Sequence, residues 1–187
     1  MFSRLRTEAG YTALEALLVV AIFGVVSATA AFQMGSSQLK LKGDGAMRVL
    51  IAQLSTAREQ AITQRRNIQV SCTNGNQIQL IRENWPGPST TTLSTVLMES
   101  GATFEVLNGV PDTPDNFGNG QALNFGGATT IRFGSDGMLI DQLGNPINGS
   151  IFLAIRGDVR SARAVTIMGG TGRIRGYRWD GRGWRMV

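Results

Sequence analysis

The stretch that decides the fold lies near the N-terminus. It reads Gly10-Tyr11-Thr12-Ala13-Leu14-Glu15-Ala16-Leu17-Leu18-Val19-Val20-Ala21-Ile22 and stays apolar as far as Phe32, with Glu15 as its single charge. The 22 residues from Tyr11 to Phe32 would form a helix about 33 Å long, at about 1.5 Å per residue, which is enough to cross a bilayer. Arg4 and Arg6 precede the stretch, so the positive-inside rule predicts a cytoplasmic N-terminus with the rest of the chain outside the inner membrane.

Glu15 is a functional candidate, because a carboxylate within a membrane needs a partner. It lies within one helical turn of Tyr11. A cut between Gly10 and Tyr11 would create an amino terminus that could serve as this partner, in the same chain or in a neighbour. In the alternative interpretation, Glu15 extends to the lipid headgroups and pairs with nothing.

An ordinary secretory signal is the competing interpretation of this region. Leu17 to Val26 could be its apolar segment, and Ala28-Thr29-Ala30 has the small-residue pattern of a cleavage site. The protein would then be secreted and would not belong to a filament. Glu15 at the edge of the apolar run and the helical character beyond Ala31 count against this interpretation.

Helical spacing continues after the apolar stretch. Apolar residues recur at i, i+3 and i+4 from Met47 to Ile62, with mostly polar residues opposite, which is typical of a helix packed on a sheet. Gly35, Gly43 and Gly45 predict bending or fraying before this part. We expect one long helix from about Thr12 to about Arg65.

The rest of the chain predicts β-structure. Asn74-Gly75 lies between two strand-like runs and is a strong hairpin signal. A helix followed by strands indicates an α+β fold, with a long N-terminal helix packed on an antiparallel sheet. The expected strands are 67–72, 77–82, 91–98, 103–107, 129–133, 151–155, 164–168 and 174–179. The expected segments are a short polar stretch (1–10), a transmembrane helix (11–32), its amphipathic continuation (33–65) and a β-rich domain (66–187).

The composition argues against an enzyme. The chain has no His, which excludes histidine-based triads and imidazole metal sites, and Cys72 is its only cysteine. Asp112, Asp115, Asn116 and Asn119 share one loop, but their spacing is not that of an EF-hand and their composition is ordinary for turns. We therefore expect no catalytic residue, no cofactor and no metal site.

Basic residues gather at the C-terminus. Of the net charge of +5, residues 156–187 contribute eight Arg and two Asp, or +6, and the remainder sums to −1. Tyr177, Trp179 and Trp184 are interleaved with the arginines, a combination that could bind nucleic acid. Arginines that protect a sheet edge or face anionic lipids would give the same composition.

The N-terminal stretch resembles the leader of type IV pilins, although Tyr11 replaces the usual Phe and Ala16 the usual Leu. The resemblance implies that prepilin peptidase cuts after Gly10 and N-methylates Tyr11. It also implies that Glu15, the fifth residue after the cut, serves filament assembly.

Further motifs resemble the domain shared by pseudopilin H of type II secretion and the FimT-type minor pilins. They are Leu54-x-x-Ala57-Arg58-x-x-Ala61-Ile62, Ile131-Arg132-Phe133-x-x-x-Gly137 and Gly172-Arg173-Ile174-Arg175. The resemblance implies a minor pseudopilin, a structural subunit of the type II secretion pseudopilus. Its implied partners are other major and minor pseudopilins or pilins, prepilin peptidase, the inner-membrane assembly platform, membrane lipid and secreted exoproteins. Its implied location is the bacterial inner membrane, as a single-pass protein that joins a filament after assembly.

The resemblance also supports an alternative function. Gly172-Arg173-Ile174-Arg175 matches the GRxR motif through which FimT-type minor pilins bind DNA during uptake. On a strand, Arg173 and Arg175 would point to the same side, as neighbouring phosphates require. The candidate DNA-binding residues are Gly172, Arg173, Arg175 and Arg178.

Overall fold

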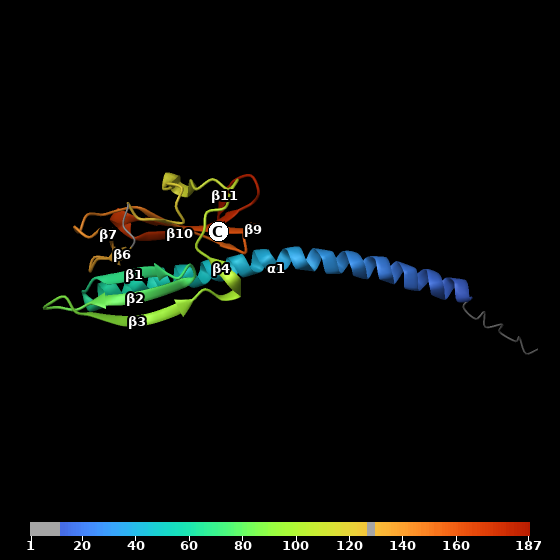
Figure 1. The fold of residues 1–187 in the computed structure, drawn as a ribbon, viewed down its shortest axis with the longest axis horizontal. Coiled ribbons are helices and arrows are strands. Elements are labelled where there is room, and N and C mark those ends of the chain that lie inside the picture. The colour runs from blue at the N-terminus through green and yellow to red at the C-terminus, as the bar shows by residue number, and fades with distance from the viewer. Residues whose placement is uncertain (1–11, 127–129) are drawn as a thin grey trace, which may run out of the picture. The chain divides into compact units, whose positions relative to one another are not determined.

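The computed structural model describes residues 12–126 and 130–187. The helix α1 (Ala13–Gln64) begins the described chain. One compact unit ends at Gln38, and the second extends from Leu39 to Val187. The helix continues through Gly35, Gly43 and Gly45, so the bending or fraying predicted there does not interrupt it. Figure 1 shows the strands of the second unit around its part of α1.

The first sheet has the strand order β3-β2-β1-β6-β7 and is antiparallel throughout. Its strands are β1 (Ile68–Thr73), β2 (Gln77–Glu83), β3 (Thr90–Leu97), β6 (Thr130–Phe133) and β7 (Leu139–Ile140). Asn74, Gly75 and Asn76 connect β1 to β2, and the φ angles of Asn74 and Gly75 are 52° and 71°. Asn and Gly adopt this left-handed conformation more readily than other residues, and the predicted hairpin is confirmed.

The second sheet has the order β11-β10-β9-β8-β4, and the short β5 also pairs with β8. Its strands are β4 (Ala102–Thr103), β5 (Leu123–Asn124), β8 (Gly149–Ile155), β9 (Asp158–Met168), β10 (Arg173–Trp179) and β11 (Trp184–Met186). Within residues 12–126 and 130–187 there are also three 3₁₀ turns: η1 (Glu99–Gly101), η2 (Pro114–Asn116) and η3 (Gly169–Thr171).

The α+β class is confirmed, and the structure differs from the expectation in detail. The domain contains two antiparallel sheets, whereas the sequence predicts one. The strand predicted at 103–107 is wrong beyond Thr103, because only Ala102 and Thr103 pair with β8. After them, the Phe104 amide donates to the Gly75 carbonyl and the Glu105 amide to the Phe152 carbonyl, so the chain there bonds to two separate elements.

One apolar core joins α1 to both sheets. The buried face of α1 carries Met47, Leu50, Leu54, Ala57 and Ala61. The first sheet contributes its alternate residues, such as Val70 and Leu80, and the second sheet contributes residues such as Leu153 and Val165. The helical spacing of the apolar residues in α1 is therefore the spacing of its contacts with the sheets.

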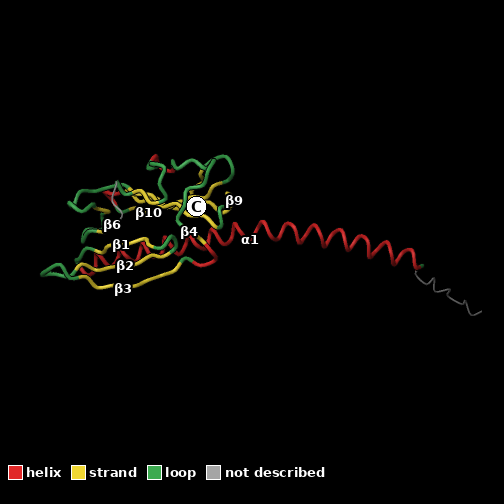
Figure 2. The backbone as a smooth tube through the Cα atoms, viewed as in Figure 1, coloured by secondary structure: helices red, strands yellow, loops and turns green. Residues whose placement is uncertain are grey.

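The strands β8 and β9 are covered on both faces. Every residue of β8 is buried, and so is β9 from Ser161 to Ile167. On the face away from α1, Phe152 and Ala164 pack with Tyr177 and with Trp184 of β11. The loop between β4 and β5 also runs over this side (Figure 2). Burial on both faces explains why β8 is continuously apolar from Ile151 to Ile155, without alternation.

Candidate functional site

The start of α1 is stabilised by Thr12 and Glu15. The Thr12 amide donates to Glu15 Oε2 at 3.0 Å, and the Glu15 amide donates to Thr12 Oγ1 at 3.3 Å. These reciprocal bonds form a capping box, which satisfies amides that a helix start leaves unpaired. The pattern Thr-x-x-Glu is present in the sequence, so this role of Glu15 could have been predicted. Gly10 and Tyr11, the predicted processing site, lie outside the described residues.

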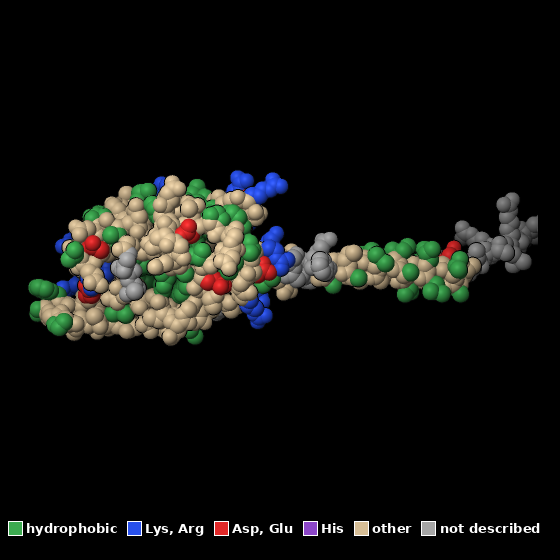
Figure 3. All heavy atoms as spheres, turned by 45° about the horizontal axis from the view of Figure 1, so that its top comes forward, with side chains coloured by type: hydrophobic (Ala, Val, Ile, Leu, Met, Phe, Trp, Pro, Cys, Tyr) green, Lys and Arg blue, Asp and Glu red, His purple; other side chains and the backbone are tan. Residues whose placement is uncertain are grey.

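The first part of α1 exposes an apolar surface. The span Ala13–Ala31 has a mean hydropathy of 2.2 and none of it is buried within the chain. Figure 3 shows hydrophobic side chains along this stretch. Its length and composition are those of a helix that could cross a membrane. An apolar surface of this extent requires an apolar environment, either lipid or other helices.

The three candidate DNA-binding arginines lie in β10, but they do not share one face of the strand. Neighbouring residues of a strand point to opposite faces, so Arg173 and Arg175 share one face and Arg178 lies on the other. Gly172 precedes them with a φ of 61°, and its amide donates to the Met168 carbonyl at 2.8 Å. Gly172 thus shapes the turn between β9 and β10.

Arg175 is bound by a carboxylate from the loop after β4. Its Nη1 lies 2.9 Å from Asp115 Oδ1, and the same carboxylate accepts bonds from Tyr177 Oη at 2.8 Å and Thr166 Oγ1 at 2.6 Å. Burial raises the pKa of Asp115, but the bonds from Thr166, Tyr177 and Arg175 outweigh it and hold the pKa below its usual value. Asp115 therefore fastens its loop to β9 and β10 and neutralises Arg175.

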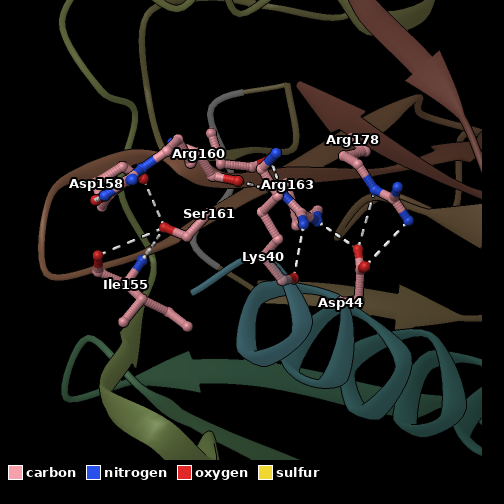
Figure 4. A network of polar contacts seen from close by, with 9 residues as sticks. Lys40, Asp44, Ile155, Asp158, Arg160, Ser161, Arg163 and Arg178 are labelled. Carbon is pink, nitrogen blue, oxygen red and sulfur yellow. Dashed lines mark hydrogen bonds and ion pairs between the residues drawn. The ribbon is translucent and has the colours of Figure 1, made fainter. Parts of the chain in front are cut away.

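Arg178 faces α1 and shares Asp44 with Arg163 (Figure 4). Arg178 donates to both Asp44 oxygens, at 3.2 and 3.0 Å. Arg163 is fully buried, and its Nε donates to Asp44 Oδ1 at 2.7 Å. Its other nitrogens donate to the carbonyls of Lys40, Arg160 and Ala162. Burial lowers the pKa of Arg163 and Asp44 opposes that shift, so the carboxylate compensates a cation held inside the domain.

The formal charge of the C-terminal segment is therefore partly compensated. Among the described residues, five of its eight arginines lie within an ion-pair distance of an Asp. Two of those aspartates, Asp44 and Asp115, lie outside the segment, and no sequence pattern indicates that they pair with it. Arg173 is exposed, and the structure gives its side chain no ion pair. The segment thus presents fewer free cations than its composition predicts.

Arg58, which belongs to the motif Leu54-x-x-Ala57-Arg58-x-x-Ala61-Ile62, has a structural contact of its own. Its Nε donates to the Gly137 carbonyl at 3.1 Å and its Nη2 to the Thr171 carbonyl at 3.0 Å. These bonds hold the loop after β6 and the turn η3 against α1. A groove of about 460 Å³ opens beside them, and Arg173 is among its lining residues.

Cys72, considered as a nucleophile, and Asp115, considered as a metal ligand, both have structural roles. Burial raises the pKa of the Cys72 thiol to about 12, so Cys72 is almost entirely a thiol, which is a weak nucleophile, near neutral pH. Asp115 is directed at β10 and is not grouped with the other acidic residue of its loop. Within residues 12–126 and 130–187, no cluster of three metal-binding side chains occurs.

The chain is similar to known proteins in both sequence and structure. A family model described as type II transport protein GspH matches residues 46–172. The type IV minor pilin FimU of Pseudomonas aeruginosa PAO1 is similar in structure, with a TM-score of 0.50 at 17% identity over 76% of this chain and 96% of that one. The minor pseudopilin EpsH from the type II secretion system of Vibrio cholerae has a TM-score of 0.44 at 13% identity, covering 74% and 94%. No curated protein sequence matches the chain significantly.

Proposed function

This chain belongs to the GspH family of type II transport proteins, and we propose that it is a minor pseudopilin of the type II secretion pseudopilus. The observation that carries the proposal is the fully exposed apolar span Ala13–Ala31, joined by one continuous helix to a folded β-domain. Such a surface fits a bilayer before assembly and the helical core of a filament afterwards. The subunit has a structural role and no catalytic one.

The proposed topology is a single pass through the inner membrane, with the N-terminus in the cytoplasm and the β-domain in the periplasm. Prepilin peptidase would remove residues 1–10 and methylate the amino group of Tyr11. Glu15 would then lie one turn from that group, in this chain or in a neighbour. Continuity of α1 past Ala31 supports an anchored helix over a secretory signal removed at that point. Other pseudopilins, the assembly platform and secreted exoproteins are the proposed partners.

Leader removal tests the proposed processing. The chain is produced with prepilin peptidase, and the N-terminus is read by mass spectrometry. We expect Gly10→Val to block the cut, because a branched side chain would occupy the position before it. Gly24→Val is the matched control, since Gly24 lies on the exposed apolar surface and a Cβ added there would meet nothing within 4 Å. Normal processing of Gly10→Val would refute the leader assignment.

Assembly tests the role of Glu15, and two variants separate its charge from its capping bonds. Glu15→Gln keeps an acceptor for the Thr12 amide and removes the charge, whereas Glu15→Ala removes both. We expect both variants to be cleaved, and both to lose cross-linking to other pseudopilins in the membrane. If Glu15→Gln cross-links like the wild type, Glu15 acts only as a helix cap.

DNA binding through the C-terminal segment is the alternative function, and its support is weaker. Of the three candidate arginines, only Arg173 is without a carboxylate partner in the described structure, while Arg175 is held by Asp115 and Arg178 by Asp44 on the opposite face. Replacing Arg173 and Arg175 by Gln and titrating double-stranded DNA at two salt concentrations tests this alternative. If the salt dependence of DNA binding is the same in this variant as in the wild type, the alternative function is refuted.

A further inference from the structure

The end of the domain at which α1 finishes carries a groove that the proposed function does not use. Two adjoining hollows of about 560 and 490 Å³ share Arg66, Asn84 and Trp85. They lie between the last residues of α1 and the loop that connects β2 to β3, and that loop extends past the end of the helix (Figure 1). We call this surface the hairpin groove. Its further basic lining residues are Arg65, Arg82 and Arg132.

Trp85 is the most exposed aromatic side chain in the described part of the domain. It is 76% exposed, whereas Trp179 is buried and Trp184 packs against Trp179 and Phe152. Leaving an indole in water forgoes the stabilisation that its burial would give. Its ring therefore offers a flat apolar face next to the basic side chains of the groove.

The cations of the hairpin groove are less compensated than those of the C-terminal segment. Arg65 and Arg66 have no ion pair in the described structure. Arg82 donates only to neutral oxygens, to Asn84 Oδ1 at 3.0 Å and to Gln64 Oε1 at 3.2 Å. The remaining arginine, Arg132, lies 2.7 Å from Glu83, which is the acidic residue of the lining. Three of the four arginines thus have no carboxylate partner in the described structure.

We propose that the hairpin groove binds single-stranded nucleic acid. One base would stack on Trp85, and backbone phosphates would lie on Arg65, Arg66 and Arg82. Free cations beside an exposed aromatic ring are the combination that binds single strands without sequence preference. A second copy of this chain is a poorer occupant, because each copy carries a net positive charge, with or without residues 1–10, and the two would repel. This inference is independent of the filament role.

Binding is measured on the full chain in a non-ionic detergent, with fluorescent oligo-dT as the probe, at several salt concentrations. Arg65→Gln/Arg66→Gln is expected to weaken binding at least tenfold and to reduce the slope of log K against log salt by about 1.4, which is two single-strand phosphate contacts. The matched control is Arg156→Gln/Arg182→Gln, which removes two exposed arginines that also have no ion pair in the described structure. This control is expected to change the affinity for oligo-dT by less than about twofold and to leave the slope of log K against log salt unchanged.

The aromatic contact has a separate test. Trp85→Ala is expected to weaken oligo-dT binding by roughly 5-fold to 150-fold, the effect of one stacked base, and Trp85→Phe is expected to restore most of it. Poly-glutamate of equal charge is the competitor that detects a groove built for acidic protein. The proposal is overturned if Trp85→Ala binds like the wild type, if both arginine pairs weaken binding equally, or if poly-glutamate competes as well as oligo-dT. Near-UV circular dichroism of each variant verifies that the domain is folded.

Discussion

Removing the carboxylate of Asp44 should destabilise the domain by about 3 kcal/mol. Arg163 is fully buried, with Asp44 Oδ1 2.7 Å from its Nε. Asp44→Ala would leave this cation with backbone carbonyls alone. Removing one member of a buried ion pair costs about 3–5 kcal/mol, because the other charge stays uncompensated. The Asp44 side chain is 15% exposed, so water can enter the vacated space, and we expect the lower end of that range.

A double-mutant cycle separates this effect from the loss of packing. Arg163→Met removes the buried charge and keeps much of the side-chain volume, while Asp44 retains Arg178 as a partner. We expect Asp44→Ala/Arg163→Met to be more stable than the sum of the two single effects predicts, by about 2 kcal/mol. Urea unfolding of the full chain in detergent, followed by tryptophan fluorescence, measures each variant. A cost below about 1 kcal/mol for Asp44→Ala, or strict additivity, would refute the argument.

Three further predictions concern single residues. Gly172→Ala should lower the free energy of unfolding by more than about 2 kcal/mol, because the φ of Gly172 is 61° and a Cβ there would lie 1.9 Å from the Gly137 carbonyl oxygen. Gly181→Ala, at a φ of 96° in open space, should lower it by only about 1 kcal/mol. Equal losses of stability in urea unfolding would contradict this. Because the pKa of Asp115 is lowered in the fold, its stabilisation is present above the unfolded value near 4 and is lost as the pH falls through the folded pKa. Asp115→Asn should therefore flatten the acid side of the stability curve, and parallel curves for the two proteins would count against the Asp115 contacts. Alkylation of Cys72 at pH 8 should be roughly a thousandfold slower in the folded chain than in urea, since burial raises its pKa to about 12; similar rates would show that the thiol is accessible.

The long helix and the first hairpin could be predicted because their signals are local. The apolar spacing from Met47 to Ile62 and the pair Asn74-Gly75 each lie within one element. The family resemblance found in the sequence is confirmed by the GspH match. By contrast, β5 and β7 have two residues each and β11 has three. Elements this short have no periodicity of their own, and they form only because the neighbouring strands are already in place.

The pairing of the arginines could not be predicted, because it depends on contacts far apart in the sequence. Asp44 precedes Arg163 by 119 residues, and Asp115 precedes Arg175 by 60. Composition counts these arginines as free positive charge, whereas the fold compensates them. The exposure of Trp85 could not be predicted from the sequence either, because an aromatic residue next to Pro86 in a loop can lie against the domain or away from it.

The contacts of Arg163 also decide how a mechanical load would pass through the subunit. This one side chain links β9 to the Lys40 carbonyl and the Asp44 carboxylate, at the beginning of the part of α1 that lies in the second unit. Tension applied to α1 would reach the second sheet through these short directional bonds before it reached most of the apolar contacts, since the buried core residues of α1 begin at Ala46. Hydrogen bonds weaken steeply with small displacements. The Arg163 contacts would therefore resist small displacements and then break abruptly, whereas the apolar core would deform gradually.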